Sequence, residues 1–174
     1  EYEMTKQIEL TQGKFAIVDD DIFDFLSQWK WTYLRPSYTK GSGYAYRQVI
    51  VSGKHIQIYM HRLLTDAPKG VYVDHINHNG LDNQRDNLRI ATPSENHYNS
   101  RPRKNTTSKY KGVYYCNGQQ RWSAEIRFDK KKKFLGYFDT ELAAAIAYNA
   151  AATRSHGDFA LLNNLEDHQE PSTP

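Results

Sequence analysis

Three sections of the chain differ in the spacing of their apolar positions. Residues 8–70 hold the β-forming runs "KFAIVD", "WTYL", "GYAYRQVIVSG" and "KHIQIYM", which are bounded by glycine and polar turns and therefore predict strands. An acidic turn followed by apolar residues at helical spacing predicts a helix after the first run, through Ile22, Phe25, Leu26 and Trp29. "HRLLTDA" predicts a further short helix, so this section mixes strands and short helices.

Residues 71–99 predict a strand, a long polar turn, a second strand and a helix. Asp74 and His75 follow the β-like "VYV", and Asn87 leads the second strand, "NLRI", after the turn "NHNGLDNQRD". The helix begins with a capping signature, made by Thr92, Pro93 and Glu95. This order of elements can bring four polar side chains together, namely Asp74, His75, Asn87 and Asn96.

Residues 108–164 predict a three-stranded antiparallel sheet and one helix. "YKGVYYC", "RWSAEIRF" and "KKFLGYF" have strand character, with "NGQQ" and "DKKK" as turns. The alanine-rich helix after them is capped by Asp139 or Thr140 and ends before Gly157, and its bulk comes from Leu142, Ile146 and Tyr148. Alternation along the second strand predicts a polar face of Arg121, Ser123, Glu125 and Arg127, and an apolar, helix-facing side of Trp122, Ala124, Ile126 and Phe128.

Charge is distributed unevenly although the net charge is only +3. Residues 1–29 carry 2 basic and 7 acidic side chains, a balance of −5, whereas residues 101–133 carry 11 basic and 2 acidic, a balance of +9. Residues 158–174 carry four acidic and no basic side chains. A dense basic section between acidic ends indicates a polyanionic partner, and nucleic acid is the usual one.

These patterns predict two modules. We expect residues 1–98 to form the first and 108–164 the second, joined by a basic linker over 99–107 and followed by an acidic tail over 165–174. No apolar run is long enough to span a membrane and the first ten residues are polar, so we expect a cytoplasmic protein with no membrane partner. The single Cys116 excludes an internal disulfide framework and a multi-cysteine zinc site.

The polar residues of 71–99 suit phosphodiester hydrolysis. Histidine is a good general base near neutral pH, and aspartate and asparagine oxygens are hard donors that suit Mg²⁺ or Mn²⁺. "DHINHNGLDNQRDNLR" followed by "SEN" resembles the HNH endonucleases, in particular the phage and intron-encoded homing branch, from about residue 60 to 99. The resemblance implies a ββα-metal fold with one divalent cation, Mg²⁺ or Mn²⁺, in which His75 is the base, Asn87 orients it, and Asp74 and Asn96 bind the metal.

Two choices stay open at this site. Asn96 and His97 are helical neighbours about 100° apart, so only one can face the ion, and the homing branch favours Asn96. His61 lies in the family's "HRL" pattern, where packing is favoured over chemistry. No structural zinc is expected, because the zinc-stabilised branch uses cysteine pairs that this chain lacks. Residues 1–60 either complete the nuclease core only or also touch DNA through their hairpin.

The 108–163 segment resembles the DNA-binding domain of plant ethylene-response factors, through "YKGV", "RWSAEIR", "FLGYFDT" and "AAIAYNAAA" in order. The resemblance implies a three-stranded sheet in the major groove with the helix packed behind it. The predicted DNA contacts, including the linker arginines, are Arg101, Arg103, Lys109, Lys111, Tyr114, Arg121, Trp122, Glu125, Arg127, Lys132 and Lys133. Trp122 matches a DNA-contacting tryptophan of that family, yet alternation places it on the helix side. Plant sequence preference is not carried over, because the plant arginines are replaced here by Lys111 and Tyr114.

The predicted fold class is therefore α+β, a ββα-metal nuclease module followed by a three-stranded antiparallel sheet packed on one helix. We expect a homing-type, site-specific endonuclease that acts on double-stranded DNA, as a monomer, inside a bacterial host if a phage encodes it. The alternatives are a non-catalytic DNA-binding regulator that retains the fold and a nuclease directed at RNA.

Overall fold

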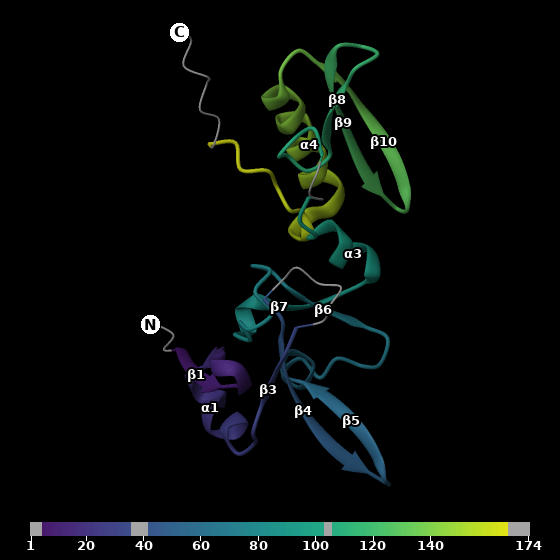
Figure 1. The fold of residues 1–174 in the computed structure, drawn as a ribbon. Coiled ribbons are helices and arrows are strands. Elements are labelled where there is room, and N and C mark those ends of the chain that lie inside the picture. The colour runs from purple at the N-terminus through teal and green to yellow at the C-terminus, as the bar shows by residue number, and fades with distance from the viewer. Residues whose placement is uncertain (1–4, 36–41, 103–105, 167–174) are drawn as a thin grey trace. The chain divides into compact units, whose positions relative to one another are not determined.

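The computed structural model describes residues 5–35, 42–102 and 106–166. The chain divides into two compact units, Glu1–Pro93 and Ser94–Pro174, and Figure 1 shows the elements of both. The structure confirms a mixed architecture of several small sheets and few helices. The ββα-metal arrangement itself stays a prediction. Among the described residues, no helix is long and apolar enough to cross a membrane.

The first unit is built from three small antiparallel sheets, ordered β1-β2, β3-β4-β5 and β6-β7. Its strands are β1 (Thr5–Glu9), β2 (Phe15–Asp19), β3 (Thr32–Leu34), β4 (Tyr44–Val51), β5 (Lys54–Tyr59), β6 (Tyr72–His75) and β7 (Leu88–Ala91). Its helical segments are η1 (Thr11–Gly13), α1 (Asp20–Ser27), α2 (Met60–Leu64) and η2 (Arg85–Asn87). Helix α3 (Pro93–Tyr98) begins at the boundary of the two units.

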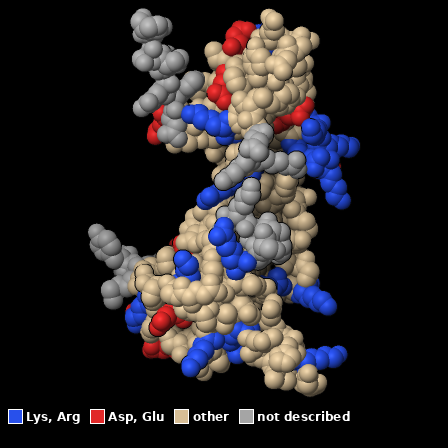
Figure 2. All heavy atoms as spheres, viewed as in Figure 1, with Lys and Arg blue, Asp and Glu red and all other residues tan. Residues whose placement is uncertain are grey.

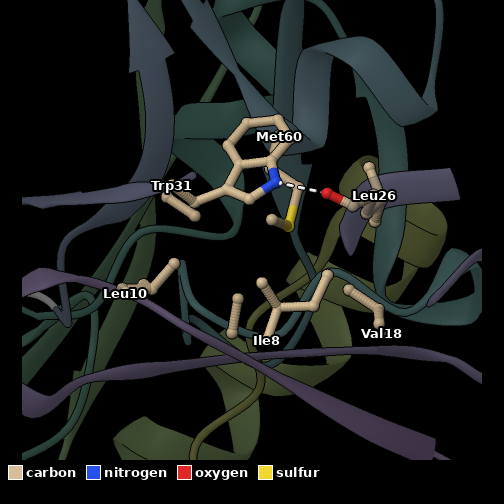
Figure 3. Packing of buried hydrophobic residues seen from close by; sticks show 8 residues of the cluster. Ile8, Leu10, Val18, Leu26, Trp31 and Met60 are labelled. Carbon is tan, nitrogen blue, oxygen red and sulfur yellow. Dashed lines mark hydrogen bonds between the residues drawn. The ribbon is translucent and has the colours of Figure 1, made fainter. Parts of the chain in front are cut away.

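An apolar cluster drawn from distant segments holds the first unit together. Its buried members are Ile8, Leu10, Ala16, Val18, Leu26, Trp31, Ala45 and Met60 (Figure 3). The Trp31 indole Nε1 donates to the backbone oxygen of Leu26 at 2.9 Å, so its polar atom is satisfied inside the cluster. Met60 opens α2, and the cluster therefore ties the β4–β5 hairpin and α2 to the N-terminal strands.

The second unit contains one antiparallel sheet in the order β10-β9-β8, as predicted. Its elements are β8 (Val113–Cys116), β9 (Arg121–Phe128), β10 (Lys131–Phe138), α4 (Glu141–His156) and η3 (Gly157–Phe159). Thr140 caps α4, since its hydroxyl accepts from the Ala143 amide at 3.1 Å, and Gly157 follows the helix at φ 53°. Four alanines of α4 lie buried and allow close packing against the sheet, namely Ala144, Ala145, Ala151 and Ala152.

The structure differs from the sequence predictions in three details of this unit. The β9–β10 turn contains only Asp129 and Lys130, both at positive φ, whereas four turn residues were expected. Such a two-residue turn matches the twist of the paired strands, so the following lysines enter the strand. Ile146 was expected to supply packing bulk but is half-exposed, and Phe128, at the end of its strand, is exposed as well.

Candidate active site and basic sheet

Asp74 and His75 lie side by side in β6 and are both buried. In the register of β6 and β7, Asp74 faces Arg89 and His75 faces Leu88. The Arg89 guanidinium donates to Oδ2 of Asp74 from Nε at 2.9 Å and from Nη2 at 2.7 Å. Because the pair is largely removed from water and Arg89 makes two hydrogen bonds to one carboxylate oxygen, Arg89 fixes where the Asp74 carboxylate points. Sequence reasoning did not assign a role to Arg89.

The turn after His75 is fixed by its own amides and carboxylate. Asp82 accepts from the Asn77 side chain at 2.7 Å and from the Gln84 amide at 3.3 Å. The Asn87 side chain accepts from the Asn77 amide at 3.0 Å and donates to the Asp82 backbone oxygen at 2.8 Å. Asn87 therefore braces the turn that begins beside His75. Its predicted role in orienting His75 by a direct hydrogen bond stays a prediction.

The N-terminal strands support this turn from outside. The Asn83 amide donates to the Ile17 oxygen, and the Ile17 amide donates to the Leu81 oxygen, each at 2.8 Å. Gly80 lies so close to the backbone that a Cβ there would come within 2.3 Å of the Gly43 oxygen. Residues before 60 thus complete the core that shapes the turn, which was one of the two roles considered for them.

Aromatic rings surround the His75 imidazole. Its centroid lies 5.1 Å from that of His61, edge to face, and 5.9 Å from that of Tyr44. Burial lowers the pKa of His75, opposed by the charges of Asp74 and Asp82 and by the neighbouring Asn83 side chain. The His75 side chain is therefore held as a neutral imidazole at neutral pH, the form in which it can accept a proton.

His61 is partly buried, and its imidazole lies beside that of the buried His75. Burial, together with the nearby His75 and Arg62, lowers the pKa of His61 to about 3. The rings of Tyr44 and Tyr59 lie tilted against it, at centroid distances of 5.3 and 5.6 Å. Its ring thus contributes to the packed wall around His75, in agreement with the packing role favoured for it.

The remaining predicted metal ligand belongs to the other unit. Asn96 is half-buried in α3 and its neighbour His97 is exposed. The choice between them for metal binding stays a prediction. Within the described ranges, no three or more His, Cys, Asp or Glu side chains gather closely enough to hold a metal ion.

The outward face of the second unit's sheet carries a polar network across all three strands. Glu125 accepts from the Tyr114 hydroxyl at 2.7 Å and from Lys132 Nζ at 3.1 Å. These two donors hold the pKa of Glu125 below its usual value. Ser123 shares this face but is fully buried, because tyrosines at 114 and 137 are its cross-strand partners.

The exposed cations of this sheet gather mainly at one place. Figure 2 shows Lys and Arg side chains clustered at the turn end of the β9–β10 hairpin. Arg127 and the lysines at 132 and 133 are exposed there. Arg121 lies on the same strand but is engaged by Asp139 at 2.7 Å. Lys109 lies over the Tyr110 ring at 5.1 Å, and Arg101 is exposed.

Two predicted DNA contacts are placed differently. Lys111 Nζ points inward and donates to the backbone oxygens of Tyr98 and Ser100, the latter at 2.7 Å, so it does not stand on the outward face. Trp122 packs on the helix side among the core residues and contacts Tyr115 edge to face at 5.2 Å. Strand alternation explains its position, and we leave Trp122 out of the proposed DNA surface. Arg103 lies outside the described residues.

Comparisons with known proteins agree with the geometry of the first unit. A family model described as HNH endonuclease matches residues 54–98. An uncharacterised HNH endonuclease of Acanthamoeba polyphaga mimivirus is 32% identical over 155 residues, which is 89% of this chain and 78% of the relative. Protein 3.8 of Escherichia phage T7 is 32% identical over 108 residues, 62% of this chain and 87% of that protein. This chain belongs to the HNH endonuclease family.

The likeness of this chain to plant proteins is partial. APETALA2-like protein 2 of rice, from both the indica and japonica subspecies, is 40% identical over 65 residues, which is 37% of this chain and only 15% of the plant protein. No solved structure matches this chain significantly. The comparisons therefore establish the endonuclease family, while a DNA-binding role of the second unit is a proposal.

Proposed function

We propose that this protein is a homing-type, site-specific DNA endonuclease that hydrolyses phosphodiester bonds with one divalent cation and His75 as general base. The observation that carries the proposal is the pair on β6, a buried, charge-paired carboxylate next to a neutral imidazole. Membership of the HNH family supports the reaction class. Relatives in a phage and a giant virus support a mobile, virus-borne origin.

His75 serves in this proposal to remove a proton from the attacking water. A base for this step must be neutral before reaction and within reach of the water. The packed rings of His61 and Tyr44 shield the imidazole from bulk solvent and favour its neutral form. Asp74 and Asp82 stabilise the imidazolium that forms once the proton has been taken up.

The donor chemistry at Asp74 fits a single, weakly held Mg²⁺ or Mn²⁺. Such ions bind through one or two carboxylates and keep waters and phosphate oxygens as their other ligands. An ionised carboxylate offers about four lone-pair sites, so the two hydrogen bonds from Arg89 do not exhaust Asp74. When bound, the cation would supply Lewis-acid stabilisation of the phosphate and the leaving oxygen. The resemblance adds Asn96 as the second protein ligand.

Double-stranded DNA is the proposed substrate, and the second unit is its proposed reader. Arg127, Lys132 and Lys133 are exposed on the β9–β10 hairpin and suit phosphate contacts. The Tyr114–Glu125 pair, bonded to Lys132, presents a fixed donor–acceptor pattern that can face base edges. Arg101, Lys109 and Arg121 complete the proposed contacts. With one site per chain, a monomer would nick one strand.

A plasmid assay tests this function. Supercoiled plasmid that carries the DNA flanking the gene's own locus is incubated with the protein and Mg²⁺ or Mn²⁺, with and without EDTA. We expect nicked or linear product at a fixed position only when the metal is present. The same assay on RNA of that sequence should give no product. Absence of cleavage with every divalent ion would overturn the proposal in favour of a DNA-binding regulator that retains the fold.

A further inference from the structure

The C-terminal part of α3 is fastened to the second unit by Tyr98. The Tyr98 ring stacks on that of His156, with centroids 3.8 Å apart and planes 6° from parallel, and more loosely on Phe128 at 6.3 Å. The Tyr98 hydroxyl accepts from the Asp129 amide at 3.3 Å. The side chain is buried, so α3 enters the second unit as a packed element and not as a free connection.

Lys111 closes the end of the same helix. Its ammonium donates to the backbone oxygens of Tyr98 and Ser100, which lie at and just beyond the end of α3, where carbonyls lack partners within the helix. The Lys111 backbone is itself fixed, since its amide donates to Asn163 Oδ1 at 2.6 Å and its oxygen accepts from Asn163 Nδ2 at 3.1 Å. The Lys111 backbone is therefore fixed in a position from which its side chain reaches the end of α3.

His156 is equally fixed before it meets Tyr98. It is the last residue of α4, and its Nε2 lies 2.9 Å from the backbone oxygen of Arg127 on β9. The stacking surface for Tyr98 is thus built by the helix and the sheet of the second unit together. Asn96, two residues before Tyr98, is carried by a short helix whose end this surface holds.

We propose that the second unit, besides reading DNA, holds the end of α3 in place. In this proposal Lys111 and His156 are positioning residues for Asn96. This inference rests on the proposed function, in which Asn96 is a metal ligand. The basic sheet that would grip DNA and the amide that would bind the cation then belong to one rigid body.

Hydrogen exchange of the metal-free protein tests whether the second unit holds the end of α3, independently of any activity. The probes are the Asn99 amide, which donates to the Glu95 oxygen at 3.2 Å, and the Ser100 amide, which donates to the His97 oxygen at 3.0 Å. Lys111→Met should speed exchange of both amides by at least about tenfold, since loss of the ammonium removes two charge-assisted hydrogen bonds at the end of the helix. The matched control, Lys133→Met, removes an exposed lysine of β10 in the same unit and should leave both amides unchanged.

Cleavage at saturating DNA tests the effect on Asn96. Lys111→Met should raise the Mg²⁺ concentration for half-maximal rate about tenfold with little change in KM for DNA, as expected when a ligand is poorly held. Lys133→Met should show the reverse, a higher KM for DNA and an unchanged Mg²⁺ requirement. If Lys111→Met does not fold, His156→Leu, which removes the stacked ring and keeps Lys111, should produce the same two changes to a smaller extent.

The outcomes separate this inference from the proposed function. If the exchange rates of the Asn99 and Ser100 amides are unchanged in Lys111→Met, the claim that Lys111 holds the end of α3 is wrong. Faster exchange with an unchanged Mg²⁺ requirement overturns the positioning of Asn96. If the unaltered protein cleaves with no divalent ion, the proposed function fails and the positioning claim falls with it, whereas the exchange experiment still decides whether Lys111 holds α3.

Discussion

The two units each contain an Arg–Asp ion pair, and the pairs differ chiefly in burial. In the first unit, Arg89 meets Asp74 at 2.7 Å with side-chain exposures of 16% and 7%. In the second, Arg121 meets Asp139 at the same distance with exposures of 45% and 86%. A buried pair fixes its members in one place, whereas an exposed pair exchanges freely with water and salt. The first arrangement suits chemistry, and the second suits a surface that must rearrange on a polyanion.

The same contrast extends to the surrounding residues. His75 lies among packed rings with a depressed pKa, and the turn that follows it is braced by Asp82 and Asn87. The outward face of the β8–β10 sheet instead presents solvent-facing cations at a hairpin end. Burial of polar groups is costly unless they are paired, so their concentration in the first unit points to a reacting centre.

The largest expected effect tests whether the first unit performs the cleavage chemistry. His75→Ala removes the proposed base and should lower the single-turnover cleavage rate by about 10²–10⁴-fold, the usual contribution of a positioned general base. The rate is measured with DNA and Mg²⁺ in excess. A rate within threefold of the unaltered protein would show that His75 is not the base.

Removal of the arginine should lower the free energy of unfolding more at the buried ion pair than at the exposed one. Arg89→Met leaves the Asp74 carboxylate buried without its cation and should reduce the free energy of unfolding by about 3–5 kcal/mol. Arg121→Met breaks an exposed pair and should cost about 0–1 kcal/mol. Urea unfolding of both variants measures the difference. Equal losses would mean that the two pairs are equivalent and that burial does not distinguish the units.

Acid sensitivity should originate in the first unit. The folded His61 stays neutral down to a pKa of about 3, while the unfolded side chain takes up a proton near its ordinary value of 6.5. Stability from this group is therefore complete above about pH 6.5 and is lost as pH falls toward 3. Between pH 7 and pH 4 the unaltered protein should lose roughly 2–4 kcal/mol more than His61→Phe, after allowance for partial solvation. Denaturant titrations at the two pH values measure this; a parallel loss in both proteins would refute it.

The smallest effect concerns the second unit's surface. Arg127→Ala should weaken DNA binding several-fold, by about 1 kcal/mol, and reduce the slope of log Kd against log salt by about 1. Fluorescence anisotropy between 50 and 200 mM salt provides both quantities. The control is Lys14→Ala, an exposed lysine of the first unit that has no proposed DNA contact, and its slope should not change.

Local patterns predicted most of the elements, since each depends on residues close in sequence. The three strands and the Thr140-capped helix of the second unit are examples, as are β6, which carries Asp74 and His75, and β7, which directly follows Asn87. The Asp74–Arg89 pair was missed because it depends on the register of two strands separated by a long turn. Register fixes cross-strand neighbours, and it is not written in the period of either strand alone.

Long-range contacts explain why local patterns did not predict the surroundings of individual residues. Lys111 has the sequence context of a phosphate contact, but its ammonium is used by carbonyls at the end of α3, thirteen and eleven residues earlier in the chain. The support that Ile17 and Gly43 provide to the turn after His75 depends on tertiary packing in the same way. Neither relation leaves a periodic signal in sequence.

The most direct test of this division of labour is the DNA affinity of His75→Ala, measured with Mg²⁺ present alongside its cleavage rate. If the first unit performs the chemistry and the second reads DNA, the variant should bind its target DNA with a Kd within about twofold of the unaltered protein while cleavage falls by about 10²-fold or more. A variant that loses affinity in proportion to its rate, or that cleaves normally, would contradict the account.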